Sequence, residues 1–511
     1  MKQSTRLITN TGATFIRMMV TIGLGLVGTR VLLKHLGDVD FGLIGALGAT
    51  GALLAATKAA LTTSAQRHFA YETGRKDWAA LQRVFFTAWI LFILLGVVLW
   101  AAGASLAPVI MHMLIIPESR IDAAWWVYQL SLLTIVVTVW STPFRAMLTA
   151  HQMIVVTSIA DGVFGILRFF SILLLLIVPW DLMITYVAMQ VGLLALVQGF
   201  LALRCLQTIP HCRFRADLFD RQEVKRILHF AGWGSLGNLS QSMRLQGGVL
   251  LVTSFFGPGM NAANTIAVQI VGYISNVKEA IRLAVQPVIV GAEARGDRKT
   301  AHQMTLASSK YIALIITLGF VPVFLEAEQF LDLWLVDTPP FTLILTRLSI
   351  VWILVNVLFV GHVLALQATG DIGWFTRAVL MISALILGGT WLSFRAGLPV
   401  WWLPLITIAG MLVQLIVAVV GIGRKIELSP CRWLQKTLAP LLSVTAPAAC
   451  AATAMHVFFP NTLWRFLSVF ATYNLVAAPL IWLVAFEQWE RQHFERVLST
   501  VLIRLKLKRP T

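Results

Sequence analysis

Long apolar segments recur along the whole sequence and constrain the fold more than any other feature. Each is about 20 residues long, the length that an α-helix needs to cross a hydrocarbon layer of about 30 Å. Of the 511 residues, 58% are apolar and only 12% are charged, about half the charged share of a soluble domain. We therefore predict an all-α integral membrane protein. Its predicted spans, about fourteen in number, cover residues 11–34, 41–66, 84–103, 123–148, 153–179, 183–203, 227–255, 262–289, 305–326, 342–368, 373–395, 399–423, 438–459 and 463–486.

Basic residues between the spans predict the orientation of the chain. With a cytoplasmic N-terminus, the strongest basic loops all lie on the cytoplasmic side, as the positive-inside rule requires. These segments are residues 67–83, 204–226, 295–299, 424–436 and 491–509. Most of the net charge of +17 then faces anionic membrane lipids, so no nucleic-acid partner is expected. We predict a multi-pass protein of the bacterial inner membrane with both termini in the cytoplasm.

Two stretches of the chain repeat one another at a constant offset. Residues 35–77 and 255–297 both read as an apolar helix, a glycine-containing turn, a second helix with a lysine, and a charged loop. The matched pairs are Gly37 with Gly257, Lys58 with Lys278, and Asp77 with Asp297. Such repeats are common in transporters, whose substrate site lies between the two halves.

The repeat predicts two pseudo-symmetric six-helix lobes followed by two additional helices. The predicted parts are an N-terminal lobe, a basic cytoplasmic linker, a C-terminal lobe, two further transmembrane helices, and a basic amphipathic tail on the inner leaflet. They cover residues 1–207, 208–226, 227–425, 426–490 and 491–511.

This organisation, with the Leu-Gly…Phe-Gly turn after the first span and the basic loop between the halves, resembles the oligosaccharide flippases. These are the Wzx-type O-antigen transporters of the multidrug/oligosaccharidyl-lipid/polysaccharide exporter superfamily. The resemblance implies a transporter that moves an undecaprenyl-pyrophosphate-linked oligosaccharide to the outer leaflet by alternating access, for cell-surface polysaccharide biosynthesis. It also implies a glycan polymerase and glycosyltransferases as partners, and no cofactor.

Charged residues inside the spans are the candidate site residues, because an unpaired charge in hydrocarbon is costly and marks a pathway or a partner. The predicted substrate-binding cations are Arg17, Lys58, Arg168, Arg244, Lys278 and Arg282. Together they predict a cationic track for a pyrophosphate group, because Arg and Lys both bind phosphate oxygens. The acids at similar depth are Asp161 and Glu279, which we predict to couple an ion or to pair with cations. Lys310 and Arg347 lie near the ends of spans, where we predict that they snorkel to the surface.

The same sequence pattern is compatible with other functions. The sequence has no Walker A motif, zinc motif or Ser–His–Asp arrangement, so we expect neither an enzyme nor a metal site. A lipid-linked peptidoglycan precursor flippase fits the same pattern. A multidrug cation antiporter of the same superfamily fits less well, because it needs acids in the first and seventh spans, which contain arginine instead. A membrane scaffold for glycan synthesis is the alternative that involves no transport.

Overall fold

The computed structural model describes residues 2–492 except residues 57, 213 and 461, and describes only the backbone of residues 2–20, 59, 60, 216 and 229–235. Every regular element of this described part is a helix. Eleven of its helical segments are long and apolar enough to cross a membrane, which confirms the predicted all-α membrane fold. They are Thr21–Ala55, Trp78–Met113, Glu118–Ala150, Val155–Ile177, Leu182–Thr208, Arg298–Leu325, Thr342–Thr369, Gly373–Arg395, Trp402–Lys425, Pro430–Phe458 and Leu463–Ala485.

Two very long helices each contain a bend at a glycine. These are α1 (Lys2–Ala55), bent at Gly37, and α7 (Arg221–Ala294), bent at Gly257. Gly37 has φ 75° and ψ 173°, and Gly257 has φ 83° and ψ 176°, a conformation that only glycine adopts without strain. Each long helix therefore corresponds to two predicted spans, and the bends lie at matched positions of the predicted repeat.

The turns that follow the repeated helices also share their geometry. Lys76 and Gly296 both have a positive φ, of 58° and 70°. The next residues, Asp77 and Asp297, cap the following helices by accepting a hydrogen bond from the backbone N–H three residues later, at 2.9 Å and 3.1 Å. Matching bends and matching caps at one constant offset support the internal repeat.

The predicted helix over residues 41–66 is interrupted in the structure. Helix α1 ends at Ala55, Ala56 lies in a turn, and α2 (Lys58–Arg75) begins two residues later. The backbone N–H groups of the first turn of a helix have no partner within that helix. This break places Lys58 at the N-terminal end of a helix.

The contacts between residues divide the chain into two compact units. The first consists of Met1–Ile270, Asp332–Thr346 and Ile372–Gly410, and the second of Val271–Leu331, Arg347–Asp371 and Met411–Thr511. The predicted lobe boundaries stay a prediction. The shorter elements of the chain are η1 (Glu118–Arg120), η2 (Leu175–Ile177), η3 (Ala216–Leu218), α9 (Ala327–Trp334) and α14 (Gly423–Lys425).

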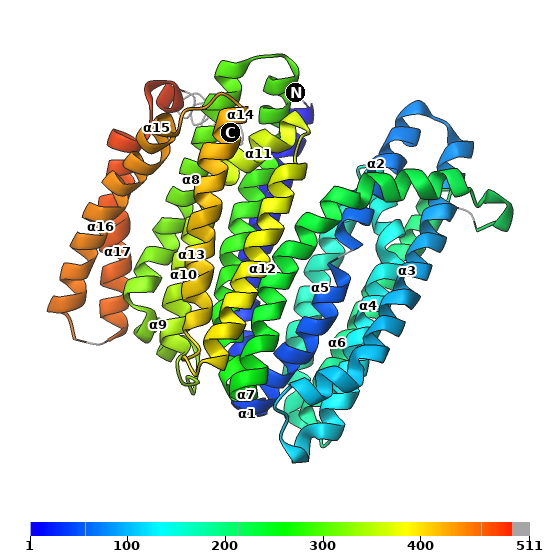
Figure 1. Cartoon of the computed structure of the whole chain (residues 1–511), viewed down its shortest axis with the longest axis horizontal. Helices are drawn as coiled ribbons and strands as arrows, with labels where there is room; N and C mark the ends of the chain where they lie inside the picture. Colours follow the sequence, from blue (N-terminus) through cyan, green and yellow to red (C-terminus); the bar gives the residue numbers. More distant parts are fainter. Residues whose placement is uncertain (1, 57, 213, 461, 493–511) are drawn as a thin grey trace, which may run out of the picture. The chain divides into compact units, whose positions relative to one another are not determined.

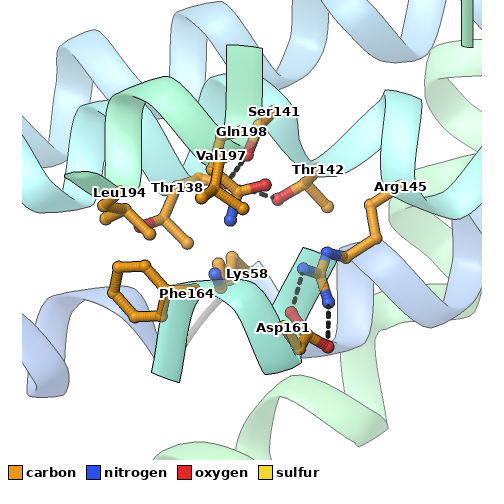
Figure 2. Close-up of a pocket in the computed structure, with 10 residues that line it drawn as sticks. All are labelled: Lys58, Thr138, Ser141, Thr142, Arg145, Asp161, Phe164, Leu194, Val197 and Gln198. Atoms are coloured by element: carbon orange, nitrogen blue, oxygen red, sulfur yellow. Dashed lines mark hydrogen bonds and ion pairs between the residues drawn. The ribbon is translucent and has the colours of Figure 1, made fainter. Parts of the chain in front are cut away.

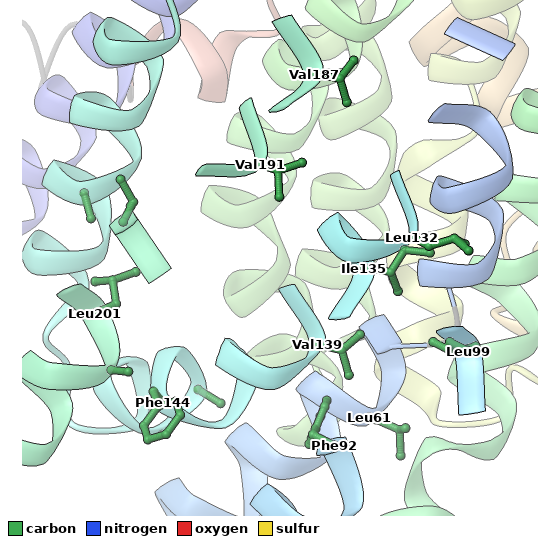
Figure 3. Packing of buried hydrophobic residues seen from close by; sticks show 14 of the residues in the cluster. Leu61, Phe92, Leu99, Leu132, Ile135, Val139, Phe144, Val187, Val191 and Leu201 are labelled. Atoms are coloured by element: carbon green, nitrogen blue, oxygen red, sulfur yellow. The ribbon is translucent and has the colours of Figure 1, made fainter. Parts of the chain in front are cut away.

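In the first unit, α4 (Ile121–Ala150) is the central helix. It packs against α1, α2, α3 (Trp78–Met113) and α6 (Leu182–Thr208), and α5 (Ile154–Leu174) packs between α1 and α6. Helices α3, α4 and α6 run side by side in Figure 1. Buried apolar side chains from α2, α3, α4 and α6 form the core, among them Leu61, Phe92, Val139 and Leu201 (Figure 3).

Within the same unit, α1 and α7 approach each other backbone to backbone at Gly42. A β-carbon there would overlap the carbonyl oxygen of Pro258 and lie 3.1 Å from the backbone nitrogen of Ala262. Asn261 donates a hydrogen bond from Nδ2 to the carbonyl oxygen of Gly42, at 2.9 Å. The contact therefore requires glycine at position 42.

In the second unit, α8 (Arg298–Leu325) packs against α11 (Val360–Thr369) and against the hairpin of α16 (Ala439–Phe458) and α17 (Leu463–Leu480), which is seen in Figure 1. The buried carboxylate of Glu326 holds the hairpin by accepting hydrogen bonds from His456 and Arg465. Lys310 is 1% exposed and pairs with Glu490 at 2.8 Å. The prediction that Lys310 snorkels is therefore wrong, because a partner 180 residues away pairs with it inside the protein.

Four further helices and three π-helical turns complete the described chain. The helices are α10 (Thr342–Val357), α12 (Gly373–Arg395), α13 (Trp402–Ile416) and α15 (Pro430–Trp433). The π-helical turns are η4 (Val417–Ile422), η5 (Leu434–Leu438) and η6 (Ile481–Ala485). Such turns are rare and occur frequently at functional sites.

Candidate functional site

A cavity with charged and polar side chains in its wall lies within the first unit, between α2, α4, α5 and α6 (Figure 2). Its volume is about 290 Å³. Phe164, Leu194 and Val197 form apolar parts of the wall. The polar lining residues are Lys58, Thr138, Ser141, Thr142, Arg145, Asp161 and Gln198. The lining therefore contains two cations and one carboxylate, a net charge of +1.

Lys58 supplies this excess positive charge. It is the first residue of α2, it is partly buried, and its side chain lies at the cavity in Figure 2. Among the residues that the structure describes, its ammonium group makes no hydrogen bond or ion pair. The N-terminus of a helix carries a partial positive charge of its own. The ammonium group and the helix end together favour an anion at this place.

The second cation, Arg145, is held by Asp161 in a two-point ion pair. Arg145 extends from α4, and its two terminal nitrogens lie 2.6 Å and 3.2 Å from the two carboxylate oxygens of Asp161 on α5. Both side chains remain partly exposed, at 33% and 40%. The guanidinium group therefore remains accessible from the cavity while its charge is balanced.

Three hydroxyl groups of α4 line this cavity, and each already donates its hydrogen bond to a backbone carbonyl oxygen of the same helix. Thr138 donates to the carbonyl oxygen of Thr134 at 2.6 Å, whereas Ser141 and Thr142 both donate to that of Thr138, at 3.1 Å and 2.8 Å. Each hydroxyl oxygen keeps lone pairs that accept hydrogen bonds. The cavity thus combines cations for an anion with acceptors for hydroxyl groups.

Gln198 of α6 adds an unsatisfied polar atom. The residue is 7% exposed, and its Oε1 has no hydrogen-bond partner within the described part of the chain. A buried acceptor without a partner costs about 1–3 kcal/mol. A bound molecule with a hydroxyl or amide donor would satisfy this oxygen.

Comparisons by sequence identify no relative: no family model matches the chain, and no curated protein matches it. Comparisons by structure find chains with a similar fold. The chain aligns with lipid II flippase MurJ in an inward closed conformation at a TM-score of 0.69 and 12% identity, over 92% of this chain and 98% of that one. It aligns with an inward-facing multidrug resistance MATE family transporter of the MOP superfamily at a TM-score of 0.65 and 15% identity, over 81% and 98% of the two chains. The chain has the fold of the MOP-superfamily transporters. A third MOP transporter, from Pyrococcus furiosus, aligns at a TM-score of 0.57 and 16% identity, over 82% and 96%.

Among the predicted site residues whose side chains the structure describes, two line the cavity, Lys58 and Asp161. Arg168 lies on α5 and donates from a terminal nitrogen to the hydroxyl oxygen of Tyr186, at 3.3 Å. Arg244 is buried in α7, with 8% of its surface exposed. Both belong to the first unit, together with the cavity. Arg17 is a predicted site residue whose side chain lies outside the described part of the structure.

The remaining predicted site residues, Lys278, Glu279 and Arg282, belong to the second unit of the chain. Lys278 donates to Oδ1 of Asn356 at 3.0 Å. Arg282 forms an ion pair with Glu279 at 2.5 Å and also donates to Gln286 at 2.7 Å. Both predicted cations of this unit, Lys278 and Arg282, thus have protein partners. The two predicted acids, Asp161 and Glu279, each pair with an arginine.

The sequence analysis missed Arg145, although a pattern in α4 marks it. Residues 138, 141, 142 and 145 are polar and follow the spacing i, i+3, i+4, i+7, which places them on one face of an otherwise apolar helix. A polar stripe on a membrane-spanning helix predicts a cavity or a polar partner. No group of three or more metal-binding side chains occurs among the described residues.

Proposed function

We propose that the chain is a flippase that translocates an undecaprenyl-pyrophosphate-linked oligosaccharide across the bacterial inner membrane by alternating access, for cell-surface polysaccharide biosynthesis. The observation that carries this proposal is the ammonium group of Lys58, without a protein partner among the described residues, at the start of α2 in a cavity lined by hydroxyl groups. The MOP fold supports transport as the general activity.

The charge of the cavity suits the pyrophosphate group of such a cargo. A partly buried ammonium group without a protein partner loses hydration, and a bound anion offsets that loss. Lys58 offers a compact ammonium charge, and Arg145 offers a planar guanidinium group that can donate hydrogen bonds to two phosphate oxygens at once. Arg145 exchanges part of its contact with Asp161 for the pyrophosphate when cargo is present.

The neutral part of the lining suits the sugar next to the pyrophosphate. The wall offers four oxygen atoms that can accept hydrogen bonds, which are the hydroxyl oxygens of Thr138, Ser141 and Thr142 and the Oε1 of Gln198. The hydroxyl groups of a sugar can donate these hydrogen bonds. Small-molecule pockets are usually about 300–1,000 Å³, so a cavity of about 290 Å³ holds the pyrophosphate and part of one sugar. The rest of the glycan and the lipid tail remain outside it.

A flippase for the lipid-linked peptidoglycan precursor is the second candidate. It is supported by the alignment with lipid II flippase MurJ, which covers 92% of this chain, against 81% for the MATE transporter. A multidrug cation antiporter is disfavoured because the net charge of the cavity is positive. Under the favoured proposal, a glycan polymerase, glycosyltransferases and anionic lipids are the partners, and both termini are cytoplasmic.

The test is complementation of a strain that lacks the gene. Lys58→Ala is expected to lower surface glycan at least about tenfold, because a charge-assisted hydrogen bond contributes about 1.5–3 kcal/mol. Arg75→Ala, which removes an exposed cation from the other end of α2, is the matched control and should complement fully. Mass spectrometry of the lipid-linked intermediate that accumulates on the inner leaflet distinguishes the glycan from the peptidoglycan precursor. Full complementation by Lys58→Ala at normal protein level would refute the proposed site.

A further inference from the structure

A second cavity lies within the second unit, where η5 packs against α8 and α15 and where residues that follow η6 also line the wall. Its volume is about 410 Å³. Four cations line it, which are Lys299, Lys310, Arg432 and Lys436. The lining also contains two carboxylates, those of Glu487 and Glu490, and apolar side chains that include Leu306, Leu428 and Trp489. Its composition is therefore cationic with an apolar wall.

Two of the four cations are neutralised by the two carboxylates. Lys310 pairs with Glu490 at 2.8 Å, and both side chains are 2% exposed. Lys310 donates a further hydrogen bond to the carbonyl oxygen of Ala485, also at 2.8 Å. Lys436 pairs with Glu487 at 3.2 Å. No carboxylate in the lining is left for the other two cations.

Lys299 and Arg432 therefore give this cavity an excess of two positive charges. Both are exposed residues of the lining, and within the described ranges neither side chain makes a hydrogen bond or an ion pair. Gln303 and Gln435 line the cavity beside them and offer amide donors. Two free cations and two amide groups around one hollow form the chemistry of a phosphate site.

The backbone around the cavity is irregular on two sides. Gln435 and Lys436 belong to the π-helical turn η5, and the carbonyl group that holds Lys310 is that of Ala485, the last residue of the π-helical turn η6. Short π-helical turns occur frequently at functional sites, where they place side chains that a regular helix would not bring together.

We propose that this cavity binds a phosphate group of about two negative charges, supplied by an anionic phospholipid headgroup or by a free phosphate ion. Arg432 and Lys299 bind the phosphate oxygens, and Leu306, Leu428 and Trp489 face the glycerol and the start of the acyl chains when a lipid is bound. Basic pockets between membrane helices on the cytoplasmic side are known to take such headgroups. This site is separate from the cavity of Lys58 and does not depend on the cargo.

The basic tail of the chain is an unsuitable occupant. Residues 493–511, which lie outside the described part, contain five Lys or Arg residues and one Glu in the sequence. Their charge has the same sign as the excess in the cavity, so the two repel each other. A dianionic ligand neutralises the cavity instead.

The experiment uses the purified full-length chain in two arms. In the first, native mass spectrometry measures binding of phosphatidic acid from nanodiscs made of phosphatidylcholine and phosphatidic acid. In the second, calorimetry measures binding of inorganic phosphate to the protein in neutral detergent. Arg432→Gln is expected to weaken binding about tenfold. Arg424→Gln, an exposed cation of the same region that does not line the cavity, is the matched control and should leave binding unchanged.

The two arms together show whether the cavity binds phosphate, and whether that phosphate comes from a lipid or from solution. Binding in the first arm alone, with the expected loss in Arg432→Gln, assigns the lipid headgroup, and binding in the second arm with the same loss assigns the free ion. Equal binding by the wild type and Arg432→Gln in both arms, or an equal loss in Arg424→Gln, overturns the site. Lys299→Gln replaces Arg432→Gln if the latter melts before ligand is added.

Discussion

The buried ion pair between Lys310 and Glu490 makes a quantitative prediction about stability. Both side chains are 2% exposed and lie 2.8 Å apart. Removing one partner of such a pair leaves an uncompensated buried charge and costs about 3–5 kcal/mol. Lys310→Met keeps the length of the side chain, and Glu490→Gln keeps its shape. Either substitution alone is expected to destabilise the second unit by this amount.

The double variant should recover much of that loss. In Lys310→Met/Glu490→Gln no unpaired charge remains, and the Gln oxygen still accepts the hydrogen bond that the backbone N–H of Glu487 donates to Glu490 at 2.6 Å. Replacing a buried ion pair by neutral groups of similar volume is often close to neutral. The single substitutions and the double substitution together form a double-mutant cycle that isolates the interaction of the pair.

The assay is thermal unfolding of the purified protein in detergent. One kcal/mol shifts the melting temperature of a cooperative unit of 150–250 residues by about 2–4 °C, so each single variant should melt about 6–20 °C lower. Lys436→Met, which breaks the more exposed pair with Glu487, is the control and should cost less than about 1 kcal/mol. Single variants that melt with the wild type, or a double variant that melts as low as the singles, would refute the reasoning.

Three further predictions concern the first unit. Gly42→Ala forces a β-carbon against the carbonyl oxygen of Pro258 and should lower the melting temperature, with a cost of at least about 1–3 kcal/mol. Gly48→Ala, which meets no atom within 4 Å, should not lower it, and equal melting of the two variants would contradict the close approach. Asp161→Asn frees Arg145 in a partly exposed pair, so it should cost less than about 1 kcal/mol of stability. The same variant should gain a larger rise in melting temperature from added pyrophosphate than the wild type does, and an equal rise would count against an anion site. Lys58→Arg keeps the positive charge and should restore more surface glycan than Lys58→Ala, measured by the same complementation assay.

The sequence predicts the helices of this chain well because the membrane requires long apolar segments and because two turns carry clear local signals. Gly37 and Gly257 mark positive φ angles, and Asp77 and Asp297 mark helix starts. These features depend on residues close together in the chain. They are therefore visible without knowledge of the tertiary fold.

The site is only partly predictable from the sequence, because it depends on contacts between residues that are distant in the chain. Lys58 and Asp161 stand out as rare charges in apolar segments, whereas Arg145 lies near the end of its predicted span and resembles an interfacial residue. The break before Lys58 carries no glycine or proline signal. Lys310 lies near the end of its predicted span, which predicts a surface position. Its partner Glu490 is distant in sequence, and only the packing of the second unit brings the two together.

The contact at Gly42 has a consequence for how a duplicated chain can diverge. At the offset of the repeat, Gly42 corresponds to Ala262, and these two equivalent positions meet each other, with room for a methyl group on one side only. The alanine of the second copy could not stand at position 42 in this packing, because its β-carbon would overlap the carbonyl oxygen of Pro258. The two sides of the contact are therefore not interchangeable, and exchanging residues 42 and 262 is the smallest change that tests which side requires glycine.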